Sequence, residues 1–268
     1  MTDKPQGASI TGLLEIMEAL RHPDTGCPWD LEQSFETIAP YTIEEAYEVE
    51  DAIRSGDMEA FKSELGDLLF QTVFQAQIAK EANQFDFDDI VKTLSTKMIS
   101  RHPHVFGNEA EQNTAEEQKL AWEDRKAAER ADKAARLGRP PSVLDDVPLA
   151  LPALMRAEKL QKRAARIGFD WNDIGAVYKK VLEEAEELSK AKDSEDQSHV
   201  HEEFGDLLFV VVNLARHLKL DPETALRDAN AKFERRFRYV ETQSADKGTQ
   251  GDLEAMEALW QEAKRLEK

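Results

Sequence analysis

The chain contains the same five residues twice, as Gly66-Asp67-Leu68-Leu69-Phe70 and, 139 residues later, as Gly205-Asp206-Leu207-Leu208-Phe209. The aspartate of each copy ends a Glu-x-x-Asp pattern. The glutamate of that pattern comes sixteen positions after the last glutamate of a Glu-Glu-x-x-Glu pattern, so five acids repeat at the offset of 139. Because acids are 54 of the 268 residues, five such coincidences have a chance frequency of about 0.2 to the fifth power. The sequence is therefore an internal duplication that includes carboxylates. The repeated acids are Glu44, Glu45, Glu48, Glu64 and Asp67 in the first copy, and Glu183, Glu184, Glu187, Glu203 and Asp206 in the second.

The bulk composition limits the class of protein. A length of 268 residues accommodates two domains, and 41% hydrophobic with 33% charged residues is typical of a soluble globular protein. A net charge of −19 argues against binding of a nucleic acid polymer, which requires a basic face. The N-terminus lacks the apolar core of a signal peptide, no apolar run reaches the roughly 18 residues of a membrane span, and Cys27 is the single cysteine. We therefore expect a cytoplasmic protein without a membrane or nucleic acid partner.

The clearest break in the chain is rich in proline. Four of the ten prolines lie within residues 138–152, directly after Gly138. The sequence therefore predicts an N-terminal domain over residues 1–137, a Pro-rich linker over 138–152, and a C-terminal domain over 153–268.

Apolar residues elsewhere recur at helical spacing. The segments from Ile174 to Leu188 and from Phe204 to Ala215 each place them on one helix face. Polar stretches at residues 55–57 and 192–198 interrupt the pattern as the loop of a helix hairpin does. Because no segment shows the alternation of a strand, we predict an all-α fold.

The second acidic pattern predicts a metal site. Residues three apart share a helix face, so Glu184 lies beside Glu187, and Glu203 beside Asp206 on the next helix. Four converging anions need a cation, and an all-oxygen ligand set favours Mg²⁺ or Mn²⁺. The alternative is a solvated acidic face, but Val210 continues the flank of the second pair. In the first copy Gln71 takes the place of Val210, so burial of that cluster is less strongly indicated. The first-copy equivalents are Glu45, Glu48, Glu64 and Asp67.

Basic pairs follow each acidic pattern. These residues are Lys97 with Arg101 and Trp122 with Lys126 in the first copy, and Lys232 with Arg236 and Trp260 with Lys264 in the second. Cations that hold phosphate charge and an aromatic ring that stacks on a base suit a phosphorylated nucleoside. The alternatives are a solvated stripe of salt bridges and a core tryptophan. The sequence has no glycine-rich phosphate loop.

The sequence resembles the MazG family of nucleoside triphosphate pyrophosphohydrolases. The resemblance rests on both acidic patterns, on Gly26-Cys27-Pro28-Trp29-Asp30, on the stretch Arg101 to Phe106, and on the stretch Lys232 to Phe237. It implies two tandem all-α MazG-like domains, a homodimer, and Mg²⁺-dependent hydrolysis of nucleoside triphosphates to monophosphate and pyrophosphate. A role in clearing unwanted nucleotides from the cellular pool follows from the same resemblance.

The resemblance also assigns site residues. The family's metal ligands match Glu184, Glu187, Glu203 and Asp206. Its substrate-binding positions match Lys180, Lys232, Arg236, Trp260 and Lys264. The predicted substrate-binding set also includes Glu183, Glu184, His199 and Asp206. His199 stands where some relatives carry lysine, and Tyr41 occupies the first-copy position of Lys180. We therefore expect the C-terminal half to be the main active half.

The expected chemistry divides the roles among these residues. A carboxylate that the metal does not saturate, Glu183 or Glu184, takes the proton of the attacking water, while Lys232 and Arg236 stabilise phosphate charge. Two rival functions stay open at this point. One is an isoprenoid-type enzyme that binds Mg²⁺ and diphosphate, and the other is an acidic helical scaffold that binds a basic protein.

Overall fold

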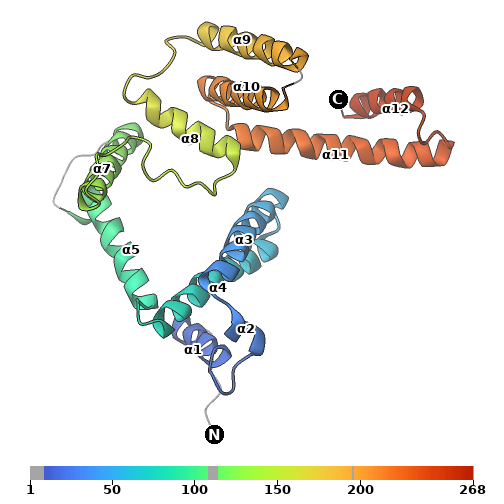
Figure 1. Cartoon of the computed structure of the whole chain (residues 1–268). Helices are drawn as coiled ribbons and strands as arrows, with labels where there is room; N and C mark the ends of the chain where they lie inside the picture. The colour runs from blue at the N-terminus through green and yellow to red at the C-terminus, as the bar shows by residue number, and fades with distance from the viewer. Residues whose placement is uncertain (1–8, 108–113, 195, 268) are drawn as a thin grey trace. The chain divides into compact units, whose positions relative to one another are not determined.

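The computed structural model describes residues 9–107, 114–194 and 196–267, and every regular element in these ranges is a helix (Figure 1). The prediction of an all-α fold is confirmed for this part of the chain. The chain forms two compact units, and the division between them lies between Trp122 and Glu123. No described helix has the length and apolarity that a bilayer crossing needs.

Helices α1 to α6 lie in the first unit, α7 extends across the division, and α8 to α12 lie in the second unit. The helices are α1 (Ile10–Leu20), α2 (Pro28–Glu32), α3 (Phe35–Ser55), α4 (Met58–Glu81), α5 (Phe87–Arg101), α6 (Pro103–Phe106), α7 (Ala115–Arg136), α8 (Ala153–Ala165), α9 (Ile174–Asp193), α10 (Gln197–His217), α11 (Pro222–Lys247) and α12 (Leu253–Leu266).

Each unit contains a helix hairpin that carries one acidic pattern. The short loops predicted from the sequence join α3 to α4 and α9 to α10, which therefore run antiparallel as packed neighbours. Asp57 caps α4 and Asp196 caps α10, and each carboxylate accepts two backbone N–H groups of its helix's first turn. Gly56 ends α3 with a φ of 73°, a left-handed conformation that favours glycine. The duplication thus preserves the hairpin together with its acids.

The core of the first unit lies between α1, α3 and α4. Its fully buried side chains are Met17, Ile38, Val73 and Phe74. Because these residues come from three helices, their burial holds the α3–α4 hairpin against α1.

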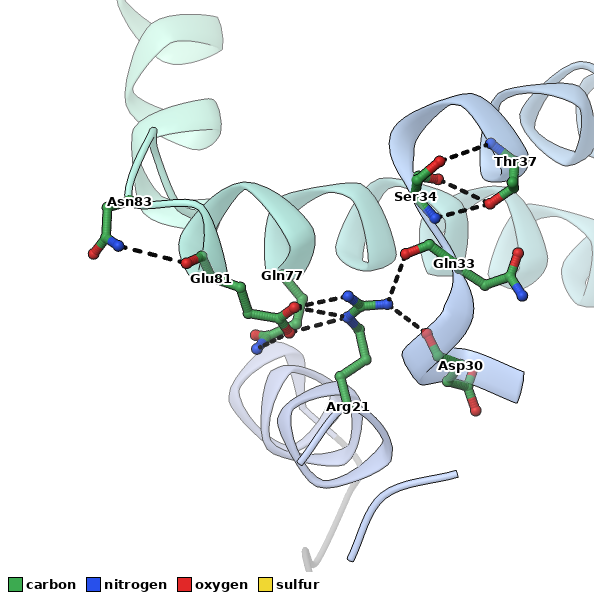
Figure 2. Close-up of polar contacts among 8 residues, drawn as sticks. All are labelled: Arg21, Asp30, Gln33, Ser34, Thr37, Gln77, Glu81 and Asn83. Atoms are coloured by element: carbon green, nitrogen blue, oxygen red, sulfur yellow. Dashed lines mark hydrogen bonds and ion pairs between the residues drawn. The ribbon is translucent and has the colours of Figure 1, made fainter. Parts of the chain in front are cut away.

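A buried arginine fastens the chain between α1 and α3 to this core (Figure 2). Arg21 forms an ion pair with Glu81 at 2.7 Å, and its guanidinium also donates to the backbone carbonyls of Asp30 and Gln33. The same guanidinium lies 5.4 Å from the ring centre of Phe74. A buried charge must be paired and hydrogen-bonded, and these contacts meet that requirement.

In the second unit, α10 packs against α8 and α9, and α11 packs against α8 and α12. Gln161 on α8 donates from Nε2 to the backbone carbonyl of Phe209 at 2.7 Å, which ties α8 to α10. The buried apolar side chains in these helices include Val177, Val210, Val212, Val240 and Leu259.

The division between the units lies within α7, before the Pro-rich segment 138–152 where the sequence predicts the boundary. That segment is bound to the second unit. Arg163 on α8 donates to the carbonyls of Val143 at 3.1 Å and Asp145 at 2.6 Å, and Arg139 pairs with the Asp145 carboxylate at 2.8 Å. These contacts hold residues 143–145 against α8.

Candidate functional site

Three acids of the second copy converge between α9 and α10. One carboxylate oxygen each from Glu184, Glu187 and Glu203 lies within 4.8 Å of the other two. Glu184 is buried, and the other two are partly buried. Asp206 is exposed, and its carboxylate is not within this group of described residues. We call Glu184, Glu187 and Glu203 the C-terminal trio; Asp206 as a fourth metal ligand stays a prediction.

Lys180 supplies a cation at the edge of the C-terminal trio. Its Nζ lies 2.7 Å from an oxygen of Glu183 and 2.7 Å from an oxygen of Glu184. Hydrogen bonds to Glu183 and Glu184 raise the pKa of Lys180 well above its ordinary value. His199, one turn before Glu203 on α10, places Nδ1 3.5 Å from that carboxylate. The structure therefore places Lys180, Glu183 and His199 next to the trio, and their role in substrate binding stays a prediction.

The electrostatics of the C-terminal trio match those of an anion cluster. Burial raises the pKa of Glu187, Lys180 opposes this shift, and the charges of Glu184, Glu183 and Glu203 raise the pKa further. The net shift is upward even with Lys180 nearby. An all-oxygen donor set with excess negative charge has the chemistry of a Mg²⁺ or Mn²⁺ site.

The predicted phosphate-binding cations gather on α11 and α12. The guanidinium of Arg236 lies 5.8 Å from the ring centre of Trp260, and its Nε is 2.6 Å from Glu267. Lys232 precedes Arg236 by one turn of α11, and Lys264 follows Trp260 by one turn of α12. We call Lys232, Arg236, Trp260 and Lys264 the α11–α12 face.

Sequence reasoning missed the aromatic neighbours of the α11–α12 face. Phe233 lies 5.4 Å from Trp260 and stacks on Phe237 at 5.6 Å between ring centres. These three rings line a cavity of about 230 Å³ between α11 and α12, together with Val240, Leu253, Met256 and Glu257. The i, i+4, i+7 spacing of Phe233, Phe237 and Val240 was the available signal, since these positions share one helix face.

The C-terminal trio and the α11–α12 face are separate groups within this half. In the described residues of the unit, no hydrogen bond or ion pair joins them, and α9 does not pack extensively on α11 or α12. Figure 1 likewise draws α9 beside α10 and α12 beside α11. The sequence suggests that both groups bind one nucleotide. Within one chain, however, Lys180 and His199 lie next to the carboxylates, and the α11–α12 face does not.

The first copy forms a matching N-terminal trio. Oxygen atoms of Glu45, Glu48 and Glu64 lie within 4.8 Å of one another between α3 and α4. Asp67 is exposed and outside this group. Burial is the main cause that raises the pKa values of Glu45 and Glu64, and the negative charge of Asp67 raises both further. Three of the four predicted acids therefore converge, Asp67 does not join them, and metal binding here stays a prediction.

A buried glutamine that the predictions did not include adjoins the N-terminal trio. Gln71 is 7% exposed, and its Nε2 lies 3.5 Å from Glu45 Oε1. The sequence signal was a polar residue in the α4 position that corresponds to buried Val210 of α10.

The predicted first-copy cations lie on α5 and α7. The guanidinium of Arg101 lies 5.0 Å from the ring centre of Trp122, and the His102 ring lies 5.2 Å from the same tryptophan. Lys126 lies 3.9 Å from Glu123 on α7, and Lys97 lines a groove on α5. The aromatic–arginine pairing of the α11–α12 face is thus repeated.

Comparisons with known proteins match both halves. A model of the MazG nucleotide pyrophosphohydrolase domain matches residues 33–106 and 174–240. The chain is 54% identical over 264 residues to the nucleoside triphosphate pyrophosphohydrolase of Escherichia coli (strain K12), which covers 96% of this chain and 98% of that protein. It is 42% identical over 264 residues to the nucleoside triphosphate pyrophosphohydrolase/pyrophosphatase MazG of Thermotoga maritima, with 97% and 98% covered. A shorter match, 39% over 168 residues, joins 62% of the chain to 48% of the nucleoside triphosphate pyrophosphohydrolase of Mycobacterium tuberculosis.

Proposed function

The chain belongs to the MazG nucleotide pyrophosphohydrolase family, and we propose that it hydrolyses nucleoside triphosphates to monophosphates and pyrophosphate at the C-terminal trio. The observation that carries the placement is the convergence of Glu184, Glu187 and Glu203 within 4.8 Å beside Lys180. This group combines oxygen donors for a divalent cation with a fixed positive charge for phosphate. The first copy has Tyr41 where Lys180 stands, which supports assigning catalysis to the C-terminal half.

The donor set of the C-terminal trio fits a divalent cation of the Mg²⁺ type. Glu184, Glu187 and Glu203 would hold it, with Asp206 as the predicted fourth ligand. When bound, Mg²⁺ polarises the phosphoryl group and lowers the pKa of a coordinated water. The upward pKa shift of Glu187 supports this fit, because a cation would relieve the repulsion that contributes to it.

Glu183 is the better candidate for the proton acceptor. It does not belong to the trio, and its side chain is 57% exposed, so water can reach it. Glu184 is 7% exposed and contributes to the trio instead. Lys180 bridges the two carboxylates and holds Glu183 next to the trio, where that carboxylate can accept a proton from the attacking water.

The α11–α12 face is proposed to bind the rest of the nucleotide. Arg236 and Lys232 would carry the phosphate charge, as charge-assisted bonds to phosphate are among the strongest polar contacts. The cavity lined by Phe233, Phe237 and Trp260 has flat aromatic surfaces on which a base can stack. Arg236 would link the phosphate contact to the stacking surface, because its guanidinium is close to the ring of Trp260.

We propose a homodimer to bring these two groups together. The α9–α10 hairpin exposes an apolar stripe of Leu182, Phe204 and Leu208, whose side chains are exposed in one chain. Large exposed apolar surfaces favour self-association. A second copy covering this stripe could present its α11–α12 face to the C-terminal trio, which a single chain does not do.

Product analysis tests the proposed reaction. The full chain is incubated with ATP or dTTP and Mg²⁺, and the products are separated by ion-exchange chromatography. We expect monophosphate and pyrophosphate, with no turnover in EDTA. Diphosphate and orthophosphate would contradict the reaction class. An isoprenoid diphosphate in place of the nucleotide tests the rival enzyme class and should remain unconsumed.

The predicted cellular setting follows from this reaction. A nucleotide substrate is consistent with a cytoplasmic enzyme that clears the nucleoside triphosphate pool. Sedimentation of the full chain at micromolar concentration tests the dimer; a stable monomer would contradict it.

A further inference from the structure

A buried amide adjoins the N-terminal trio. Gln71 lies on α4, one turn beyond Asp67, and only 7% of its surface is exposed. Its Nε2 points to Glu45 Oε1 at 3.5 Å, so the amide group is beside the carboxylates of the trio. Its carbonyl oxygen, Oε1, is buried and has no hydrogen-bond donor in the described part of the chain.

An amide oxygen without a partner is costly inside a protein. Burial of such a group without a hydrogen bond destabilises the fold, because the bonds that it makes to water in the unfolded chain are lost. The second copy shows that the hairpin does not require it, because Val210 occupies the equivalent position of α10 and is buried there. A glutamine at this site therefore calls for an interaction that offsets its burial.

The N-terminal trio also lacks the internal cation of its counterpart. Lys180 bonds to Glu184 in the second copy, whereas the equivalent residue of the first copy is Tyr41, whose ring lies 6.2 Å from Trp29. No basic side chain pairs with the trio in residues 9–107. Uncompensated carboxylates and an unpartnered amide oxygen thus occur side by side.

We propose that Gln71 Oε1 is an uncharged oxygen ligand in a divalent-cation site formed with Glu45, Glu48 and Glu64. Hard cations such as Mg²⁺ and Mn²⁺ accept amide carbonyl oxygens together with carboxylates. The contact of Nε2 keeps the amide beside Glu45, and Oε1 is the atom that would be offered to the cation. The first half is therefore a cation site in its own right, with a ligand set that differs from that of the catalytic half and with no lysine competing for the carboxylates.

Mn²⁺ binding to the full chain tests this assignment without reference to hydrolysis. The C-terminal trio is first disabled by Glu184→Gln with Glu203→Gln, so that the remaining strong binding reports the N-terminal trio. The dissociation constant for Mn²⁺ is then measured by electron paramagnetic resonance of the free ion. Gln71→Val, which copies the residue of the second half, should weaken binding by about ten- to a hundredfold. Gln71→Glu keeps an oxygen at the site and should bind Mn²⁺ at least as tightly as glutamine.

Two controls keep the result interpretable. Gln261→Val makes the same substitution on exposed α12 and should leave the dissociation constant unchanged. Gln71→Met preserves side-chain length without the oxygen, so it should weaken Mn²⁺ binding even if the valine variant packs poorly. The melting temperature without metal should not fall in Gln71→Met, since the unsatisfied amide is removed.

A structural role for Gln71 predicts the opposite pattern. In that case Gln71→Met would lower the melting temperature in EDTA and leave the Mn²⁺ dissociation constant unchanged. That outcome would overturn the ligand assignment. Unchanged Mn²⁺ affinity in a folded Gln71→Val protein would overturn it as well, whatever the hydrolytic activity of the C-terminal half.

Discussion

The two halves of the molecule place the same three glutamates at the same spacing and surround them differently. The C-terminal trio lies beside Lys180, which bonds to two acids, and Val210 is a buried apolar residue on the same helix as Glu203. The N-terminal trio has Tyr41 and Gln71 at those positions. One cluster therefore has a fixed cation suited to a phosphate, whereas the other has an uncharged amide suited to a metal. Duplication of a carboxylate pattern conserves its geometry, but the neighbouring residues determine its chemistry.

Both halves also leave the equivalent surface of the hairpin uncovered. Leu182, Phe204 and Leu208 are exposed in the second half, and Ile43 and Leu65 at matching positions are exposed in the first. A repeated exposed stripe supports pairing of each hairpin with another hairpin. The site chemistry differs between the halves while this surface does not.

The largest contrast is expected from removing one charge from each trio. Glu203→Gln should lower kcat/KM by at least about a hundredfold, because it removes a charged ligand while keeping side-chain size. Glu64→Gln should retain most of the activity. Asp206→Asn should also lower activity strongly if Asp206 ligates the metal. Steady-state kinetics with circular dichroism as a folding control measure these effects, and equal losses from the Glu64 and Glu203 variants would end the assignment of catalysis to one half.

The arginines that pair with tryptophan provide the next contrast. Arg236→Ala should lower kcat/KM by about ten- to a hundredfold, the loss expected for a charge-assisted phosphate contact of about 1.5–3 kcal/mol. Arg101→Ala changes the matching arginine of the first half and should have little effect. The two variants are compared at saturating Mg²⁺. A loss for Arg101→Ala as large as that for Arg236→Ala would indicate that both halves bind the reacting nucleotide.

The Arg21 network should affect stability in the first half and leave catalysis unchanged. Arg21→Met removes the ion pair with Glu81, which keeps its bond from Gln77, and the arginine's bonds to two backbone carbonyls. It should destabilise that half by about 1–3 kcal/mol, below the value for a fully buried pair because Glu81 is 36% exposed. Urea unfolding measures the change. Lys62→Met removes an exposed pair with Glu59 and serves as the control, with an expected loss of at most about 0.5 kcal/mol.

The smallest expected effect is the pH dependence of metal stabilisation. Burial and neighbouring acids raise the pKa values of Glu45 and Glu64, and the pKa of Glu187 is raised as well. Their contribution to stability in metal-free protein is full below the unfolded pKa and is lost as pH rises through the folded pKa. Mg²⁺ offsets that loss, so it should raise the melting temperature more at about pH 7.5 than at about pH 5.

A variant of the C-terminal trio provides the control for the Mg²⁺ effect on melting temperature at the two pH values. Glu187→Gln should reduce the difference between the two pH values, since one carboxylate with a raised pKa is absent. Differential scanning calorimetry with EDTA or Mg²⁺ measures both. A larger Mg²⁺ effect at the lower pH would contradict the direction of these pKa shifts.

The helices and the acid pairs were predictable from local pattern. Apolar periodicity and the caps Asp86 and Asp221 are properties of neighbouring residues, and both caps bond to the first turns of α5 and α11 in the structure. Glu184 and Glu187 are three residues apart, so a helix alone sets them on one face. The short loop before α10 then brought Glu203 to them. These parts depend on distances along the chain that the helix geometry converts directly into distances in space.

Other features depended on how separate helices pack. The burial of Gln71, the exposure of Asp206 and the attachment of residues 143–145 to α8 follow from contacts between elements far apart in sequence. The spacing of the acids could not indicate which fourth carboxylate would point away from the trio. The two compact units divide within α7, and the domain boundary at residues 138–152 stays a prediction.

The sequence by itself determined that the protein is all-α, that its acidic hairpin is duplicated, and that it resembles the pyrophosphohydrolase family to which it belongs. Only the tertiary structure decided that the carboxylates meet in threes, and that the α11–α12 face lies apart from them within one chain. The physical reason is that helix formation and side-chain facing follow a local 3.6-residue period, whereas the meeting of two helices depends on the fit of whole surfaces.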